Sequence, residues 1–317
     1  MGHGLIKREH VRAKIEVTYG TDPTPAAADS ILIRNITHAP DRLRMVRRGA
    51  IRSSLGELQQ IYGGMLQGIS FECEVKGSGS LGVAPEVGVL LRACGLIETI
   101  NAGVSVVYTP RSTGVESCTL HYFEAGDGST SSVRHILVGS RGNVEFMYEA
   151  GDILLGRFNF VGKRTANPTD QVATAPTYDT TVPVAIKGMA STIGGVTTVV
   201  AGYTLNLNNE IVIPPNLNDV EGFGEVTIGA RDPTLELRRH NELVATIAPW
   251  ADMTAGTVRA FASGNLGPAA NRVTLAAALG VHRNVTQGEA DGMRTNTTLF
   301  GLAESATFND DFTLTFA

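Results

Sequence analysis

Three glycines, Gly77, Gly79 and Gly82, match the G-x-G-x-x-G pattern that binds dinucleotides. They follow an expected strand and precede an expected helix, as that chemistry requires. A dinucleotide fold also needs a parallel sheet of continuously apolar strands. Residues 68–76 instead alternate apolar and polar side chains, which is typical of a half-buried strand. We therefore interpret the three glycines as a turn.

Other residues that could carry chemistry are isolated. Glu72 and Glu74 could form the carboxylate pair of a glycosidase, but on one exposed strand face they are expected to be solvated. No G-x-S-x-G, P-loop or H-E-x-x-H motif occurs. No two histidines have helical metal-binding spacing; they are His3, His10, His38, His121, His135, His240 and His282. The sequence thus predicts no catalytic, cofactor-binding or metal-binding residues.

The three cysteines, Cys73, Cys94 and Cys118, are too few and too widely spaced for a disulfide framework or a zinc cluster. Cys73 and Cys94 fall on apolar faces, where a free cysteine behaves as a small hydrophobic residue. We expect the cysteines to belong to the core.

The overall charge excludes a general attraction to nucleic acid, because the net charge is −5 and the pI is near 5.8. No run of about 20 apolar residues exists that could span a membrane. The N-terminus is charged where a signal peptide needs an apolar core, so we expect folding in a cytoplasm.

Positive charge is concentrated in one long connection, residues 41–67, which carries Arg42, Arg44, Arg47, Arg48 and Arg52. Connections of this length are usually functional. The segment lacks the interleaved aromatic residues of single-strand nucleic-acid sites. A contact with an acidic protein neighbour is one interpretation; phosphate contacts and a solvated loop are the alternatives.

The surrounding elements are expected to be mostly strands. In the first half these are residues 31–38, 68–76, 104–110, 118–126, 132–139, 142–151 and 156–163. Asp127-Gly128 and Arg141-Gly142 look like tight turns. A helix is expected over residues 84–95, and the close spacing of the strands favours an antiparallel sandwich or barrel.

The second half repeats this order of elements after a Thr-, Pro- and Ala-rich stretch without periodicity. A second helix is expected around residues 250–262, and the closing segments 135–162 and 274–301 have equal length and a shared Asn-Val pair. We predict a duplication, with domains at residues 1–165 and 184–317 and a linker at 166–183.

Several motifs resemble the tail tube proteins (major tail proteins) of long-tailed bacteriophages. They are KIEVTYGTDPTP (14–25), FECEVKGSG (71–79), APEVGVLLRACGL (84–96) and VYTP (107–110). The resemblance covers most of residues 11–165. It implies a mainly β fold of tandem tail-tube-like β-sandwich or half-barrel domains, each with a short flanking α-helix. It also implies that the connection at 41–67 reaches the adjacent ring, with Asp219–Gly224 as its counterpart in the second half.

The resemblance implies a structural virion protein without catalysis or cofactor. Its subunits would form stacked rings around a channel that DNA crosses without sequence-specific binding. Because ring proteins with one such domain form hexamers, two domains per chain predict a homotrimeric ring with pseudo-sixfold symmetry. The implied partners are the tape measure, terminator and distal tail proteins, in a virion tail assembled in the host bacterial cytoplasm. The alternatives are a terminator or distal tail protein, or a carbohydrate-binding or glycan-cleaving β-sandwich.

Overall fold

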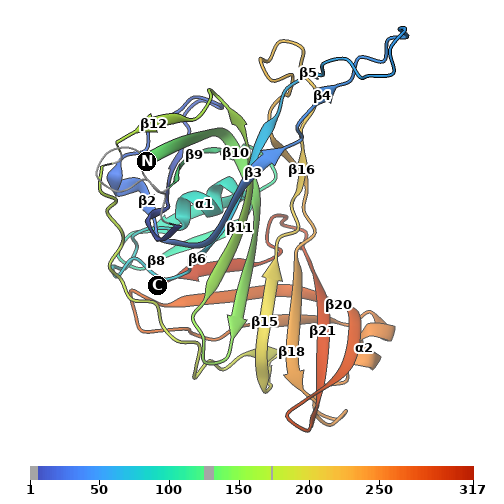
Figure 1. The fold of residues 1–317 in the computed structure, drawn as a ribbon. Coiled ribbons are helices and arrows are strands. Elements are labelled where there is room, and N and C mark those ends of the chain that lie inside the picture. The colour runs from blue at the N-terminus through green and yellow to red at the C-terminus, as the bar shows by residue number, and fades with distance from the viewer. Residues whose placement is uncertain (1–5, 125–131, 173) are drawn as a thin grey trace.

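The computed structural model in Figure 1 describes residues 6–124, 132–172 and 174–317. Antiparallel strands dominate these residues, and their α-helices are α1 (Gly88–Ala93) and α2 (Pro249–Ala255). The predicted mainly β fold with short flanking helices is therefore confirmed. The tight turn expected at Asp127-Gly128 lies outside the described residues.

The first half contains two 3-10 turns, η1 (Ile6–Arg8) and η2 (Ala27–Asp29), and these strands: β1 (His10–Ile15), β2 (Ser30–Ile31), β3 (Ile33–Asp41), β4 (Met45–Val46), β5 (Ile61–Tyr62), β6 (Leu66–Glu74), β7 (Leu96–Asn101), β8 (Ser105–Pro110), β9 (Cys118–Glu124), β10 (Ser132–Glu149), β11 (Leu155–Arg164) and β12 (Thr169–Gln171). The second half contains β13 (Thr192–Ile193), β14 (Val196–Thr197), β15 (Val200–Asn206), β16 (Glu210–Val212), β17 (Thr227–Ala230), β18 (Thr234–His240), β19 (Val258–Ala262), β20 (Val273–Ala290), β21 (Met293–Ala303) and β22 (Thr313–Phe316).

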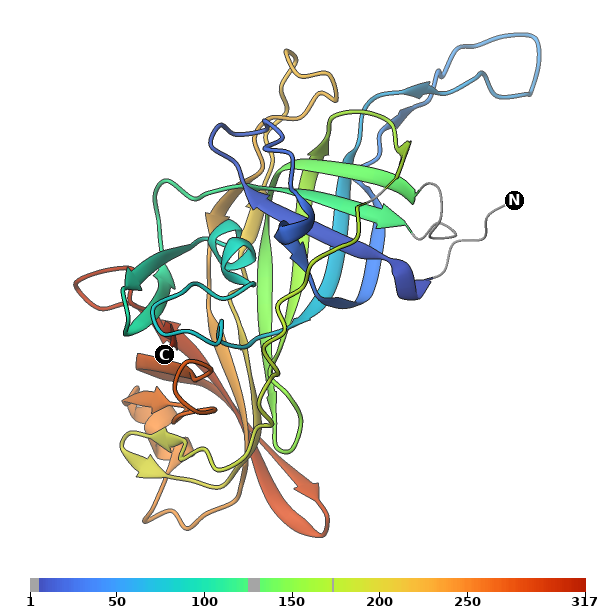
Figure 2. The ribbon, with the colours of Figure 1, turned by 90° about the vertical axis from the view of Figure 1, so that its left-hand side faces the viewer.

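One long antiparallel sheet runs through both halves in the order β3-β6-β11-β10-β15-β18-β21-β20. We call it the main sheet. Figure 1 shows its strands side by side from the green β11 to the red β21. A second layer is formed by β2, β1 and β9, and by β7, β8 and β22, with α1 packed between them and the main sheet. In Figure 2 this layer and α1 face the viewer.

The strand β10 is continuous where the sequence predicted a turn at Arg141-Gly142. A bulge between Val138 and Arg141 shifts its register, and the strand then continues to Glu149. Gly142 is needed for close packing, because a Cβ there would lie 2.2 Å from the carbonyl oxygen of Asn159 on β11. The glycine therefore marks a close approach of two strands and not a reversal of the chain.

The two halves join through β10 and β15. Tyr148 and Tyr203 are directly opposed across this ladder, and their buried rings stack with centroids 4.1 Å apart. Asn143 donates to Asn206 at 2.8 Å on the other face of the sheet. One hydrophobic cluster extends across this junction, from Phe71 in the first half into the second half.

The stretch predicted as a linker lies along the first half. Arg12 donates to the Thr174 carbonyl at 2.7 Å, and the Lys76 ammonium donates to the Thr181 carbonyl at 2.6 Å. Farther along, Asn271 donates to the carbonyl of Val182 at 2.8 Å. Side chains from both halves thus hold this segment in place.

Candidate functional site

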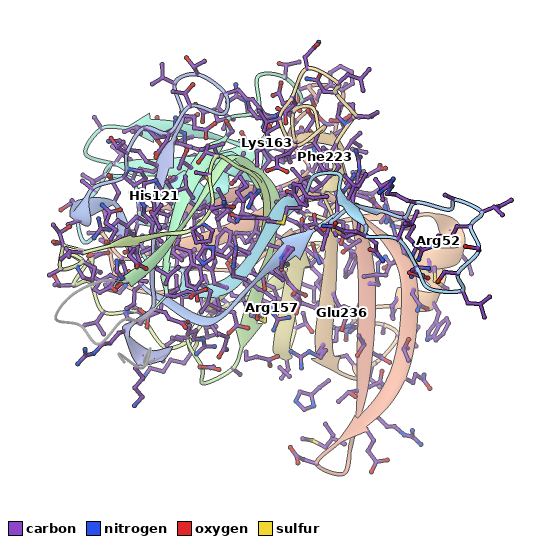
Figure 3. The ribbon with its side chains drawn as sticks, turned by 45° about the horizontal axis from the view of Figure 1, so that its top comes forward. Arg52, His121, Arg157, Lys163, Phe223 and Glu236 are labelled. Atoms are coloured by element: carbon purple, nitrogen blue, oxygen red, sulfur yellow. The ribbon has the colours of Figure 1, made fainter. Side chains whose placement is uncertain are left out.

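A long hairpin extends from one end of the molecule. It comprises residues 42–65, includes β4 and β5, and is called the first arm; Figures 1 and 3 show it projecting from the body, with Arg52 near its tip. Ile51 and Leu55 in this tip are fully exposed. Large apolar side chains held wholly in solvent are typical of surfaces that contact another protein.

The five arginines of this connection divide between the base and the tip of the first arm. At the base, the Arg44 guanidinium lies 3.8 Å from the ring centre of Phe223, and Arg42 reaches the Ile211 carbonyl at 3.5 Å. Toward the tip, Arg47 pairs with Glu57 at 3.9 Å, and both side chains are about three-quarters exposed. Among the described residues, Arg52 bonds to the Gly56 carbonyl within the loop, and Arg48 is exposed. The tip is therefore where charge is available to a neighbour.

The base of the first arm rests on the loop between β16 and β17, residues 213–226, which we call the second arm. Glu221 accepts hydrogen bonds from Tyr62, from the Met65 amide at 3.0 Å and from Arg164 at 2.9 Å. Burial alone would raise the pKa of Glu221, but the bonds from Tyr62 and Arg164 outweigh it and lower that pKa. A small apolar cluster lies beside this contact: Leu66, Ile213, Phe223 and Val226.

The predicted counterpart of the first arm, Asp219–Gly224, is part of the second arm. In the second arm, Asp219 pairs with Lys163 at 2.7 Å, and Leu217 and Val220 are fully exposed. Val17, in the loop after β1, is also fully exposed. Figure 2 shows these three loops at the same end of the molecule. This end thus presents several apolar tips together.

The opposite end has different chemistry. The hairpin of β20 and β21 ends in a two-residue turn at Asp291 and Gly292, both with positive φ. Glu289 and Asp291 are exposed there, and the neighbouring segment is tied to it by the Asn241 amide, which donates to the Arg294 carbonyl at 3.0 Å. Exposed apolar residues at this end are Leu243, Val244, Trp250 and Met293. Arg294 is also exposed and lies opposite Glu289 across the ladder, so the tip of this hairpin is weakly acidic, whereas the first arm, with five arginines and one glutamate, is basic.

One face of the main sheet packs on the core and the other is polar. A row of alternating charges, Arg34, Glu72, Arg157 and Glu145, crosses four neighbouring strands of the polar face. Glu72 accepts from Arg34 at 3.1 Å and from Arg157 at 3.0 Å, and Arg157 pairs with Glu145 at 3.3 Å. Other members of this face are Ser70, Asn143, Asn159, Thr204, Asn206 and Glu236. Figure 3 labels Arg157 and Glu236 on this sheet.

Glu72 corrects one sequence expectation, because it is only 8% exposed and not solvated. Burial would raise its pKa, but hydrogen bonds from Asn35 and Arg157 and the charge of Arg34 outweigh burial and lower the pKa. Glu72 pairs with arginines, whereas Glu74 on the same strand contacts Lys76 at 3.7 Å.

The other predicted features have structural roles. Gly79 and Gly82 adopt positive φ, which confirms the turn, and a Cβ on Gly82 would lie 2.3 Å from the Gly103 nitrogen. The three cysteines are free and buried, as expected, and burial raises the pKa of their thiols. Such thiols are poor nucleophiles.

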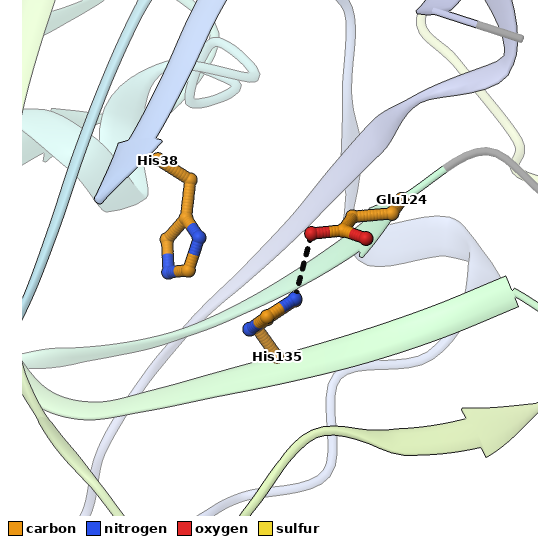
Figure 4. A group of neighbouring side chains, drawn as sticks. All are labelled: His38, Glu124 and His135. Atoms are coloured by element: carbon orange, nitrogen blue, oxygen red, sulfur yellow. Dashed lines mark hydrogen bonds and ion pairs between the residues drawn. The ribbon is translucent and has the colours of Figure 1, made fainter. Parts of the chain in front are cut away.

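The fold also assembles a side-chain cluster that sequence spacing did not reveal. His38 of β3, Glu124 of β9 and His135 of β10 converge, with one potential ligand atom from each lying within 4.8 Å of the others (Figure 4). The cluster could be found only by knowing that these three strands face each other, since 86 residues separate the first member from the second.

The described residues include no helix with the length and apolar character needed to cross a membrane. The chain is thus a mainly β protein with an extended sheet, a polar sheet face and projecting arms. The family model described as "phage tail tube protein" matches residues 7–309, so the chain belongs to that family and is a component of the virion tail. No curated protein matches the chain.

Proposed function

We propose that this chain is the tail tube subunit itself, which forms homotrimeric, pseudo-sixfold rings that stack around a channel for DNA. Assembly would take place in the host bacterial cytoplasm, with the tape measure, terminator and distal tail proteins as partners. The observation that supports the proposal is the ladder between β10 and β15, which joins strands of the first and second halves edge to edge inside one chain.

The element order supports two equivalent halves. Each half has an edge strand followed by an arm, a second strand, a short helix and a long hairpin. In the first half these are β3, the first arm, β6, α1 and the β10–β11 hairpin. In the second half they are β15, the second arm, β18, α2 and the β20–β21 hairpin. Both β10 and β20 are 18 residues long, and both carry a register shift near their middle. If the halves are equivalent, β20 corresponds to β10 and β3 corresponds to β15. The ladder of β10 with β15 within the chain would then correspond to a ladder of β20 with the β3 of a neighbouring chain.

The edges needed for that contact are free within the described residues. β19 pairs with one edge of β20 from Ala276 to Val281. Residues 282–290 have no partner strand on that edge, although β21 pairs with their other edge. The outer edge of β3 likewise has no partner strand, because its ladder is with β6. Free edges of this length normally promote association, and here they would close a ring. Each chain contributes eight main-sheet strands, so three chains would supply 24.

The polar face of the main sheet is suited to line the channel. Its arginines Arg34, Arg157 and Arg238 each pair with a carboxylate of the same face. A phosphate would have to displace these internal partners, so DNA would pass without strong binding. Stacking of rings would bring the exposed tip of the first arm of one ring against the acidic hairpin end of the next. Because these two surfaces differ, the contact is heterologous and propagates into an open polymer.

Electron microscopy of the purified full-length protein, combined with mass measurement of isolated rings, tests the proposal. The expected result is tubes or stacked rings, with three chains per ring. Six full-length chains per ring would overturn the trimer. Single rings that never stack would favour a terminator, and a monomer with affinity for glycans would favour the carbohydrate-binding alternative.

A further inference from the structure

The cluster of His38, Glu124 and His135 has the composition of a transition-metal site. Two imidazoles and one carboxylate are the donor set that Zn²⁺ and related divalent ions prefer over Ca²⁺ or Mg²⁺. Three protein ligands leave a fourth position of a tetrahedral ion for water or another donor. In Figure 4 the three side chains approach from three different strands. The backbone ladders of β3 with β6 and of β9 with β10 fix the positions of these strands. The three side chains are therefore close together before any ion binds.

The distances are close to those a bound ion requires. His135 Nε2 lies 2.9 Å from a Glu124 carboxylate oxygen, and all three donor atoms lie within 4.8 Å of one another. Zinc bonds of about 2.0–2.2 Å place tetrahedral ligand atoms roughly 3.3–3.5 Å apart. A tetrahedral arrangement would need the His38 ring nitrogen to move about 1 Å toward the other two donor atoms. The distance between His135 Nε2 and the Glu124 oxygen would also have to increase slightly.

The hydrogen-bond inventory also points to a missing partner. His38 Nε2 and His135 Nδ1 are buried and have no hydrogen bond of good geometry among the described residues, although the Gln67 side chain lies beside His38. Buried polar atoms without partners are uncommon in folded proteins. The two histidine rings lie with centroids 4.4 Å apart, and His135 contacts Glu124 through Nε2, the ring nitrogen other than the unpartnered Nδ1. We propose that His38, Glu124 and His135 form a site for one divalent transition-metal ion of the Zn²⁺ class.

The surroundings of the cluster restrain one of its ligands. Tyr122 stacks against His135 with centroids 5.7 Å apart and limits the movement of that ring.

Metal titration of the untagged full-length chain, after dialysis against a chelator, tests this site independently of tube formation. Calorimetry with Zn²⁺ and visible absorption with Co²⁺ should both saturate at one ion per chain. His38→Gln and His135→Gln should each weaken Zn²⁺ binding at least about tenfold and abolish the tetrahedral Co²⁺ spectrum. His240→Gln, which removes a strand histidine outside the cluster, should bind as the unmodified chain does.

Thermal unfolding in chelator provides the control for folding. The unmodified chain should gain stability on addition of Zn²⁺, whereas the cluster variants should unfold at one temperature with and without the ion. Should the histidine variants fail to fold, Glu124→Gln serves instead, since that side chain is 45% exposed and its replacement leaves the core intact. Absence of saturable Zn²⁺ uptake by the unmodified chain, or uptake that survives in the cluster variants, would overturn the proposal.

Discussion

Glu72 connects strands that are far apart in the sequence. It lies on β6 between Arg34 of β3 and Arg157 of β11, and each arginine is about half exposed while the carboxylate is nearly buried. Hydrogen bonds to a charged acceptor contribute more than neutral ones. This single carboxylate therefore holds together the edge of the main sheet that we propose as a ring contact.

Replacing Glu72 with Gln should lower the free energy of unfolding by about 1–2 kcal/mol at pH 7. The pKa of Glu72 is lowered in the folded state, so its contribution is present above the ordinary value of 4.5 and is lost as pH falls through the folded pKa. Denaturant unfolding at pH 7 and near pH 3 measures the difference, which should shrink at the lower pH.

Glu236→Gln is the matched control for this substitution. Glu236 lies on the same polar face and is exposed, and it has no ion-pair partner among the described residues. Its replacement should leave stability unchanged at both pH values. Equal effects of the two substitutions would contradict a specific role for Glu72.

Sequence patterns identify the residue types on each face but not their partners. The alternation of residues 68–76 predicts the apolar face that Phe71 and Cys73 form. The burial of Glu72 could not be predicted, because it depends on Arg34 and Arg157 arriving from strands 38 and 85 positions away. The same reason hides the histidine cluster, whose members meet only through tertiary structure.

At the level of elements, the alternation of apolar and polar residues predicted most strands. The main wrong prediction was a turn placed at a glycine that lies inside a strand. The sequence around Gly139 and Gly142 looks like a turn but forms a bulge inside β10, because strand continuity is decided by β9, β11 and β15 on either side. The helix expected over 250–262 is also shorter. It ends at Ala255, since Gly256 takes a left-handed conformation and β19 follows.

The first arm yields a prediction about stacking. Reversing the tip charges by Arg47→Glu, Arg48→Glu and Arg52→Glu should raise the critical concentration for tube formation roughly tenfold or more, equivalent to about 1.4 kcal/mol. The reason is repulsion from the acidic hairpin end of the next ring, and light scattering with microscopy measures it. The subunit should stay folded because this tip is exposed.

A compensating charge reversal on the β20–β21 hairpin tests whether this hairpin is the surface that the first arm contacts. Glu289→Lys with Asp291→Lys in the same chain should restore tubes to the reversed arm. Lys187→Glu, an exposed charge outside both arms, should leave assembly unchanged. Normal tubes from the reversed arm alone would exclude an electrostatic stacking role for these arginines.

On the scale of the whole molecule, strand pairing and a shared hydrophobic core join the two halves. The C-terminal strand β22 pairs with β8 of the first half, where Leu314 is opposite Tyr108. The shared core and the β10–β15 ladder add to this connection. The pairing of β22 with β8 could not be predicted from the sequence, because it leaves no periodic signal.

The proposed ring contact can be tested by cross-linking. Ala39 of β3 and Thr286 of β20 lie on the two strand edges that we propose to pair between chains, so the ring contact should bring them near each other. Directly opposed strand residues have Cα atoms about 4.5–5.5 Å apart, within disulfide range. Ala39→Cys with Thr286→Cys should therefore give a covalent trimer on mild oxidation of assembled tubes.

The native cysteines are buried and should not interfere. Ala39→Cys combined with Glu289→Cys, which shifts the register and the face, should cross-link poorly. Oxidised tubes that yield no linked species, or linked rings of six chains, would contradict the proposed pairing.

The ladder between β10 and β15 also has a kinetic consequence. It makes one sheet junction intramolecular, so a ring of six tube-like units needs two association steps between three chains instead of five between six. Each association costs about 4–15 kcal/mol in translational and rotational freedom. Ring nucleation by this chain would thus vary with the third power of subunit concentration, and it would continue in a host cell at concentrations too low for a hexamer of separate units.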